Sequence, residues 1–146
     1  MHMKKSKEIR SIANIAIPVL AGALYYFFVS PEVVIVKQLN AIRDHVFRFK
    51  INLPQNIVFE FIRNYFLDML WAYALVFALF IINGSNTATI WKIFFMAFSF
   101  SVIMEVLQCT SAVCGTFDLW DIVVEFLAEV IAVFIIKKYF MEERKE

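Results

Sequence analysis

Apolar residues along the chain gather in four long windows, and polar residues gather between them. Each window is about as long as the roughly 20 helical residues that cross a hydrocarbon layer of about 30 Å. Short polar stretches such as NGSNTA at 83–88 lie between windows and are typical of turns. The predicted helices cover 11–29, 65–83, 90–108 and 119–136. The pattern predicts an all-α fold, a polytopic membrane helical bundle with four transmembrane helices.

The outer connection at 30–64 has a different pattern. Its apolar residues recur every three or four positions: Val33, Val36, Leu39, Ile42, Val46 and Phe49. This spacing predicts an interfacial amphipathic helix that ends before Pro54. We expect this helix either to cover the bundle or to take part in binding. Within the first window, Pro18 predicts a kink.

Composition points to a membrane location. Of the 146 residues, 62% are hydrophobic, whereas soluble domains carry about 45–50% apolar residues. A single domain, 1–146, has too small an interior to bury that much apolar surface from water. The net charge is +1 and the basic residues form no single stripe, which argues against nucleic-acid binding.

Basic residues at both ends of the chain predict its orientation. They precede the first window and follow the fourth, where the tail at 137–146 begins: Lys4, Lys5, Lys7, Arg10, Lys137, Lys138, Arg144 and Lys145. Under the positive-inside rule, both termini face the cytoplasm. Five basic residues within 30–64 weigh against this orientation. The first window is longer than the apolar run of a cleaved signal peptide, so we interpret it as an uncleaved helix.

Two cysteines, Cys109 and Cys114, lie in the connection QCTSAVCGTFDLWD at 108–121. On the oxidising side of a membrane they could form a disulfide. Two unpaired thiols are the alternative. Both histidines lie in other segments, so the cysteine pair is a weak zinc signal, and we expect no cofactor.

Acidic residues follow one face of the fourth predicted helix at spacings of three, four and four: Asp118, Asp121, Glu125 and Glu129. The third window carries Ser101, Glu105 and Gln108 at similar spacing. Asp118 and Glu129 are separated by roughly 16 Å along a helix, which reaches toward the bilayer centre. Because an ionised acid facing lipid there costs about 2.5–3.5 kcal/mol, these faces should turn toward other helices or water.

Few basic residues are placed to neutralise these acids. Arg63 lies near Asp68, whereas Lys92 lies about 20 Å from Glu105 along the third helix. The acids therefore need protons, hydrogen bonds, a bound cation or a cationic ligand. One interpretation is a hydrogen-bond network that only fastens the bundle. The other is a functional site formed by Asp68, Glu105, Gln108, Asp118, Asp121 and Glu125, with Glu129 as a possible relay.

Three stretches, RNYFLDMLWAYALVFAL at 63–79, EVLQ at 105–108 and GTFDLWDIVVE at 115–125, together resemble the VanZ-like family of small bacterial integral membrane proteins. The resemblance covers helices 65–136. It places these residues on the family's polar positions: Asp68, Trp71, Glu105, Gln108, Asp118 and Asp121. Glu125 and Ala128 depart from the family's usual Asn and Gly. Because the founding member is associated with low-level teicoplanin resistance, the resemblance implies an antibiotic-resistance role at the bacterial cell envelope.

Three functional hypotheses follow. The first is a non-enzymatic, multi-pass protein of the bacterial cytoplasmic membrane whose outward-facing acidic pocket binds an envelope lipid or a cationic amphiphile. The second is a proton- or cation-coupled transporter, alone or as an oligomer, with Asp121, Glu125 and Glu129 as a relay. The third is a metal-assisted, lipid-modifying enzyme, although the sequence contains no GxSxG, HExxH or Walker motif.

Overall fold

A computed structural model describes residues 2–28, 56–83, 87–110 and 117–141, and within these ranges it does not describe the side chains at 2–7, 26–28, 63 and 87–88. The described residues form four helices and no strand: α1 (His2–Phe28), α3 (Ile57–Asn83), α4 (Thr87–Cys109) and α5 (Leu119–Tyr139). The predicted all-α fold is confirmed. The amphipathic helix predicted within 30–64 lies outside the described residues.

The helix α3 begins eight residues before the predicted apolar window, at Ile57 rather than Tyr65. Its first turn is capped by Asn56, whose Oδ1 accepts hydrogen bonds from the backbone N–H of Val58 at 3.1 Å and of Phe59 at 3.0 Å. Such a cap satisfies donors that have no partner inside the helix. The predicted window therefore covered the uninterrupted apolar part of the helix and missed its first two turns, where Glu60, Arg63 and Asn64 interrupt the apolar residues.

The helix α5 begins at the predicted residue because Asp118 caps it. Asp118 Oδ1 accepts a hydrogen bond of 2.9 Å from the backbone N–H of Trp120. At the other end, Lys137 and Lys138 occupy the last turn, where positive charge interacts favourably with the helix dipole. These residues extend α5 by about one turn beyond the predicted end.

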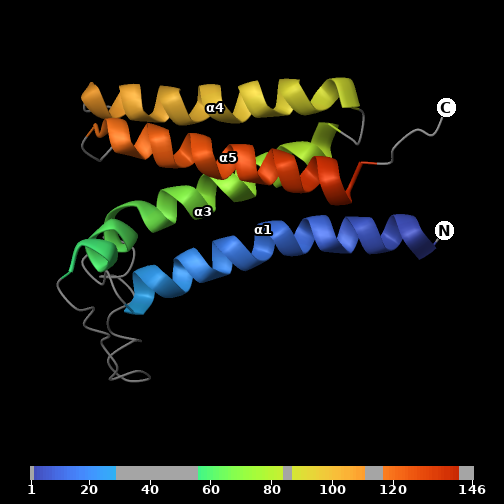
Figure 1. Ribbon diagram of the computed structural model, residues 1–146, viewed down its shortest axis with the longest axis horizontal. Coiled ribbons are helices and arrows are strands. Elements are labelled where there is room, and N and C mark those ends of the chain that lie inside the picture. The colour runs from blue at the N-terminus through green and yellow to red at the C-terminus, as the bar shows by residue number, and fades with distance from the viewer. Residues whose placement is uncertain (1, 29–55, 84–86, 111–116, 142–146) are drawn as a thin grey trace.

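The helix α1 packs closely on α3. Gly22 faces α3, where an added Cβ would lie in ordinary van der Waals contact, 3.4 Å from Leu67 Cδ2. Tyr73 Oη of α3 donates a hydrogen bond of 2.6 Å to Asn14 Oδ1 of α1. Pro18 lies inside α1, and Figure 1 shows the ribbon of α1 changing direction near its middle, in keeping with the predicted kink.

The four helices run back and forth, so each end of the bundle collects one end of every helix (Figure 1). The helix α3 contacts α1, α4 and α5, and α4 also contacts α5. We call the end formed by the start of α3, the end of α4 and the start of α5 the acidic end. The opposite end, where α1 and α4 start and α5 finishes, is the basic end.

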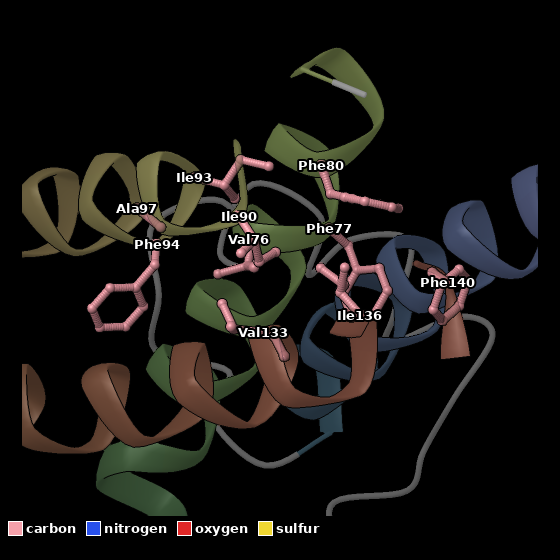
Figure 2. Packing of buried hydrophobic residues seen from close by; sticks show 11 residues of the cluster. Val76, Phe77, Phe80, Ile90, Ile93, Phe94, Ala97, Val133, Ile136 and Phe140 are labelled. Atoms are coloured by element: carbon pink, nitrogen blue, oxygen red, sulfur yellow. The ribbon is translucent and has the colours of Figure 1, made fainter. Parts of the chain in front are cut away.

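A hydrophobic core fills the half of the bundle toward the basic end. Figure 2 shows its side chains gathered between α3, α4 and α5. The cluster consists of Val76, Phe77, Phe80, Ile90, Ile93, Phe94, Ala97, Ala132, Val133, Ile136 and Phe140. The rings of Phe77 and Phe140 meet edge to face with centroids 5.6 Å apart, an arrangement that aromatic pairs prefer.

The outside of the bundle is also apolar. Large hydrophobic side chains such as Ile82, Phe95 and Phe134 are more than half exposed, which is unusual for a protein surrounded by water. Two helical segments, Asn64–Asn83 and Thr89–Cys109, are long and apolar enough to cross a membrane. The helix α5 carries three acids, and its crossing and that of α1 stay predictions.

Replacing Phe77 with Ala should lower the free energy of unfolding by ~3–5 kcal/mol, because Phe77 is fully buried and its loss leaves a cavity. Denaturant titration of the purified protein in detergent measures this change. Ile82→Ala is the control, since Ile82 is 78% exposed and its removal leaves no internal cavity. Equal losses of stability in the two variants would contradict this account of the core.

Candidate functional site: an acidic cluster between three helices

The six residues predicted as a site lie together at the acidic end. Asp68 comes from α3, Glu105 and Gln108 from the end of α4, and the other three from α5 or its cap: Asp118, Asp121 and Glu125. The carboxyl groups lie near enough to interact electrostatically, Asp68 with Glu105 and Asp121 with both of them. We call these six residues the acidic cluster.

Glu105 joins α4 to the start of α5. Its carboxylate is almost fully buried, at 4% exposure. Oε1 accepts a hydrogen bond of 3.1 Å from Gln108 Nε2, one turn further along the same helix. Oε2 accepts one of 3.3 Å from the backbone N–H of Asp118. Glu105 therefore accepts a hydrogen bond from the residue that caps α5 and also contributes a carboxyl group to the cluster.

Asp118 uses both carboxylate oxygens within the fold. While Oδ1 caps α5, Oδ2 accepts a hydrogen bond of 3.1 Å from Tyr65 Oη of α3. Tyr65 was not among the residues predicted for the site. The available signal was its position three residues before Asp68, which places both on one face of α3. Asp118 thus ties α3 to α5 and is less available to a ligand than the other acids.

Asp68 and Asp121 are the cluster's least engaged carboxyl groups. Both are partly exposed, and among the described residues no side-chain donor contacts either of them. The charged groups facing Asp121 are Asp68, Glu105 and Asp118. Repulsion between such groups favours any positive charge that enters between them. These two acids are the best placed to receive a ligand from outside.

Glu125 and Glu129 continue the line of acids into the bundle. Glu125 is 8% exposed and Glu129 is 0% exposed. Ser101 Oγ of α4 donates a hydrogen bond of 3.1 Å to Glu129 Oε1 and also interacts with the Glu125 carboxyl. The Oε2 atoms of both glutamates are buried without a hydrogen-bond partner. Unpartnered buried polar atoms are costly, so these two oxygens need an explanation.

Basic side chains that the structure describes lie away from these acids. Lys137 Nζ is 5.3 Å from the centroid of the Trp91 ring, and Lys138 Nζ is 5.1 Å from that of Tyr139, both at the basic end. The sequence predicts Arg63 near Asp68, but the structure does not describe the Arg63 side chain. Within the described part of the chain, no group of three or more His, Cys, Asp or Glu residues has an arrangement that could hold a metal ion.

In the sequence, the two cysteines lie at the end of α4 and in the connection to α5. Cys109 is the last residue of α4 and is exposed. Cys114 lies outside the described residues, so the disulfide stays a prediction.

Toward the basic end, the line of acids stops at the hydrophobic core. The inward face of α5 continues from Glu129 to Ala132, Val133 and Ile136, all buried in that core. The acidic cluster can therefore exchange ions with water at the acidic end, while packed apolar side chains fill the opposite direction. Chemically, the arrangement offers a set of acceptors suited to a positively charged group.

Replacing Asp118 with Ala should lower the free energy of unfolding by ~0.5–2 kcal/mol, since it removes the α5 cap. Tyr65→Phe should cost less, because it removes only the bond to Asp118. Denaturant titrations of wild type, both single variants and the double variant measure the coupling between them. Asp118→Asn is the matched control, as Asn also caps helices well. Strictly additive effects of Asp118→Ala and Tyr65→Phe would contradict the bond between α3 and α5.

Searches with family descriptions, characterised proteins and solved structures found no protein similar to this chain. The resemblance of 63–79, 105–108 and 115–125 to the VanZ-like family therefore stays a prediction from those residues.

Proposed function

We propose that this chain is a non-enzymatic, multi-pass protein of a bacterial cytoplasmic membrane that binds a cationic group in its acidic cluster from the outer side. One observation supports the proposal: carboxyl groups from α3, α4 and α5 lie close enough together to repel one another. Because each loses hydration inside the bundle, a cation that enters between them relieves both burial and repulsion.

Several features support four membrane crossings. The segments Asn64–Asn83 and Thr89–Cys109 have the length and composition of spans, and α5 packs on both of their helices. The acids of α5 lie on its buried face, whereas Leu127, Ile131 and Phe134 on other faces are exposed. Exposed apolar residues also occur along α1, among them Ile17 and Leu20. In a bilayer, such surfaces would contact lipid.

The charges at the two ends support the orientation. Arg10, Lys92, Lys137 and Lys138 belong to the basic end, which the positive-inside rule assigns to the cytoplasm. The acidic end would then open outward. The helix α1 starts and α5 ends on the side of the basic end in Figure 1, as an even number of crossings requires.

The surroundings of the cluster favour an amphiphilic ligand. Phe117, Leu119 and Trp120 flank the Asp118 cap and are exposed, with Trp120 at 61%. Aromatic side chains at a membrane surface can hold an apolar chain and can also attract a cation over the ring. The ligand would be an envelope lipid with a cationic head or a cationic amphiphile. A VanZ-like resistance role would follow if holding such a molecule protects the envelope.

A proton- or cation-coupled transporter is the second candidate, because Asp121, Glu125 and Glu129 descend along one face of α5. A transporter must also pass its ion to the other side. The packed side chains of Ala132, Val133 and Ile136 lie below Glu129 and weigh against such a path. Binding from one side needs no opening of the core.

Asp121→Asn should weaken binding of dodecylammonium about tenfold, because a hydrogen bond to a charged group contributes ~1.5–3 kcal/mol and ~1.4 kcal/mol is a factor of ten. Binding is measured by calorimetry on the protein in lipid nanodiscs, with empty nanodiscs subtracted. The control is Glu60→Gln, which removes an exposed acid in the first turn of α3. Equal binding by wild type and Asp121→Asn would overturn the proposed site.

Cys109 should react with a membrane-impermeant maleimide added to intact, mildly reduced cells, because it lies exposed at the acidic end. For comparison, a variant with Cys109→Ser, Cys114→Ser and Lys138→Cys places a single thiol at the basic end. That thiol should react only after the cells are permeabilised. The reverse pattern of labelling would overturn the orientation.

A further inference from the structure

Glu125, the most deeply placed acid of the acidic cluster on α5, forms a group with Glu129 and Ser101 that reaches further into the bundle. All three are more than nine-tenths buried. The Ser101 hydroxyl interacts with both carboxyl groups, so one hydroxyl serves two acids. One oxygen of each glutamate is left without a partner. We call Glu125 and Glu129 the inner pair.

The surroundings of the inner pair oppose two negative charges. Glu125 faces Asp68 from α3, Glu105 from α4 and Glu129 on its own helix. Glu129 faces Glu125 and the uncharged Ser101 hydroxyl. Among the described side chains, no basic group faces either glutamate. Two ionised carboxylates in this setting would each lack a counter-charge, which is strongly unfavourable inside an apolar bundle.

A proton suits this group better than a metal ion does. Calcium takes six to eight oxygen ligands and magnesium an octahedral set, whereas the inner pair offers two carboxyl groups and one hydroxyl. A proton needs only one carboxyl oxygen, and the unpartnered Oε2 atoms of Glu125 and Glu129 provide two such positions. Two carboxyl groups that interact this closely take up protons as a coupled pair.

We propose that the inner pair holds a proton that is released when a cation binds in the acidic cluster. This inference rests on the proposed function and adds a regulation to it. The O–H bond of the Glu125 carboxyl breaks, its electron pair stays on the carboxylate, and the proton passes to water. The cation offsets the charges of Asp68 and Glu105, which otherwise oppose ionisation of Glu125.

The proton leaves at the same end at which the cation enters. Asp68 interacts with Glu125, and Asp121 precedes Glu125 by one turn of α5. Both acids are partly exposed at the acidic end, whereas the hydrophobic core fills the other direction. The exchange is therefore one cation in and one proton out on a single side of the membrane. Acid should weaken cation binding, because protons then occupy the carboxyl groups that the cation needs.

The first experiment titrates dodecylammonium into the protein in lipid nanodiscs in weakly buffered solution with a pH indicator. Wild type should release protons as the cation binds, and Glu125→Gln should lose much of this release, because Gln cannot ionise. The control Glu60→Gln should release protons as wild type does. Binding without proton release, or equal release per bound cation in wild type, Glu125→Gln and Glu129→Gln, would overturn the inference while leaving the proposed function standing.

The second experiment needs no ligand. Infrared spectroscopy of the ligand-free protein near neutral pH should show the carbonyl stretch of a protonated carboxyl group. The band should weaken in Glu125→Gln or Glu129→Gln and persist in Glu60→Gln. Its absence from wild type, or its persistence in both inner-pair variants, would overturn the bound proton. Failure of wild type to bind dodecylammonium would instead overturn the proposed function, so the two failures are distinguishable.

Discussion

The arrangement of α3, α4 and α5 depends on one constraint: carboxyl groups without described basic partners have to be kept away from hydrocarbon. The inward face of α5 meets this constraint with a single stripe of residues. Its first half carries Asp121, Glu125 and Glu129, and its second half carries the alanine, valine and isoleucine side chains of the core. One helix face therefore builds both the acidic cluster and the packing that closes it.

The two halves of the bundle are held by different forces. Near the acidic end, hydrogen bonds to Glu105 and Asp118 connect the helices. Near the basic end, close packing around Phe77 does so. Packing tolerates little change in volume, whereas a polar network can rearrange its partners when a charge arrives. The acidic cluster, where we propose that a ligand binds, is thus separate from the packed core around Phe77.

The sequence predicted the positions of the helices well, because a long apolar window can be recognised whatever the rotation or tilt of the helix that it forms. It also placed Glu105 and Gln108 on one face, since residues three apart on a helix are neighbours. It did not predict the early start of α3, because Glu60, Arg63 and Asn64 interrupt the apolar run there and the Asn56 cap carries no hydropathy signal. The bond between Tyr65 and Asp118 spans 53 residues and depends on how α3 and α5 are rotated against each other, which spacing within one helix does not specify.

The bond between Asn14 of α1 and Tyr73 of α3 has a consequence for biogenesis. If α1 crosses the membrane as proposed and the chain is inserted from its N-terminus, α1 reaches the bilayer before Tyr73 is synthesised, and the Asn14 amide oxygen then faces lipid without its donor. Amides exposed to hydrocarbon are unfavourable. Exposure of this amide to lipid is avoided if α1 stays beside the insertion machinery until α3 is synthesised, so that the two helices enter the lipid together as a hairpin.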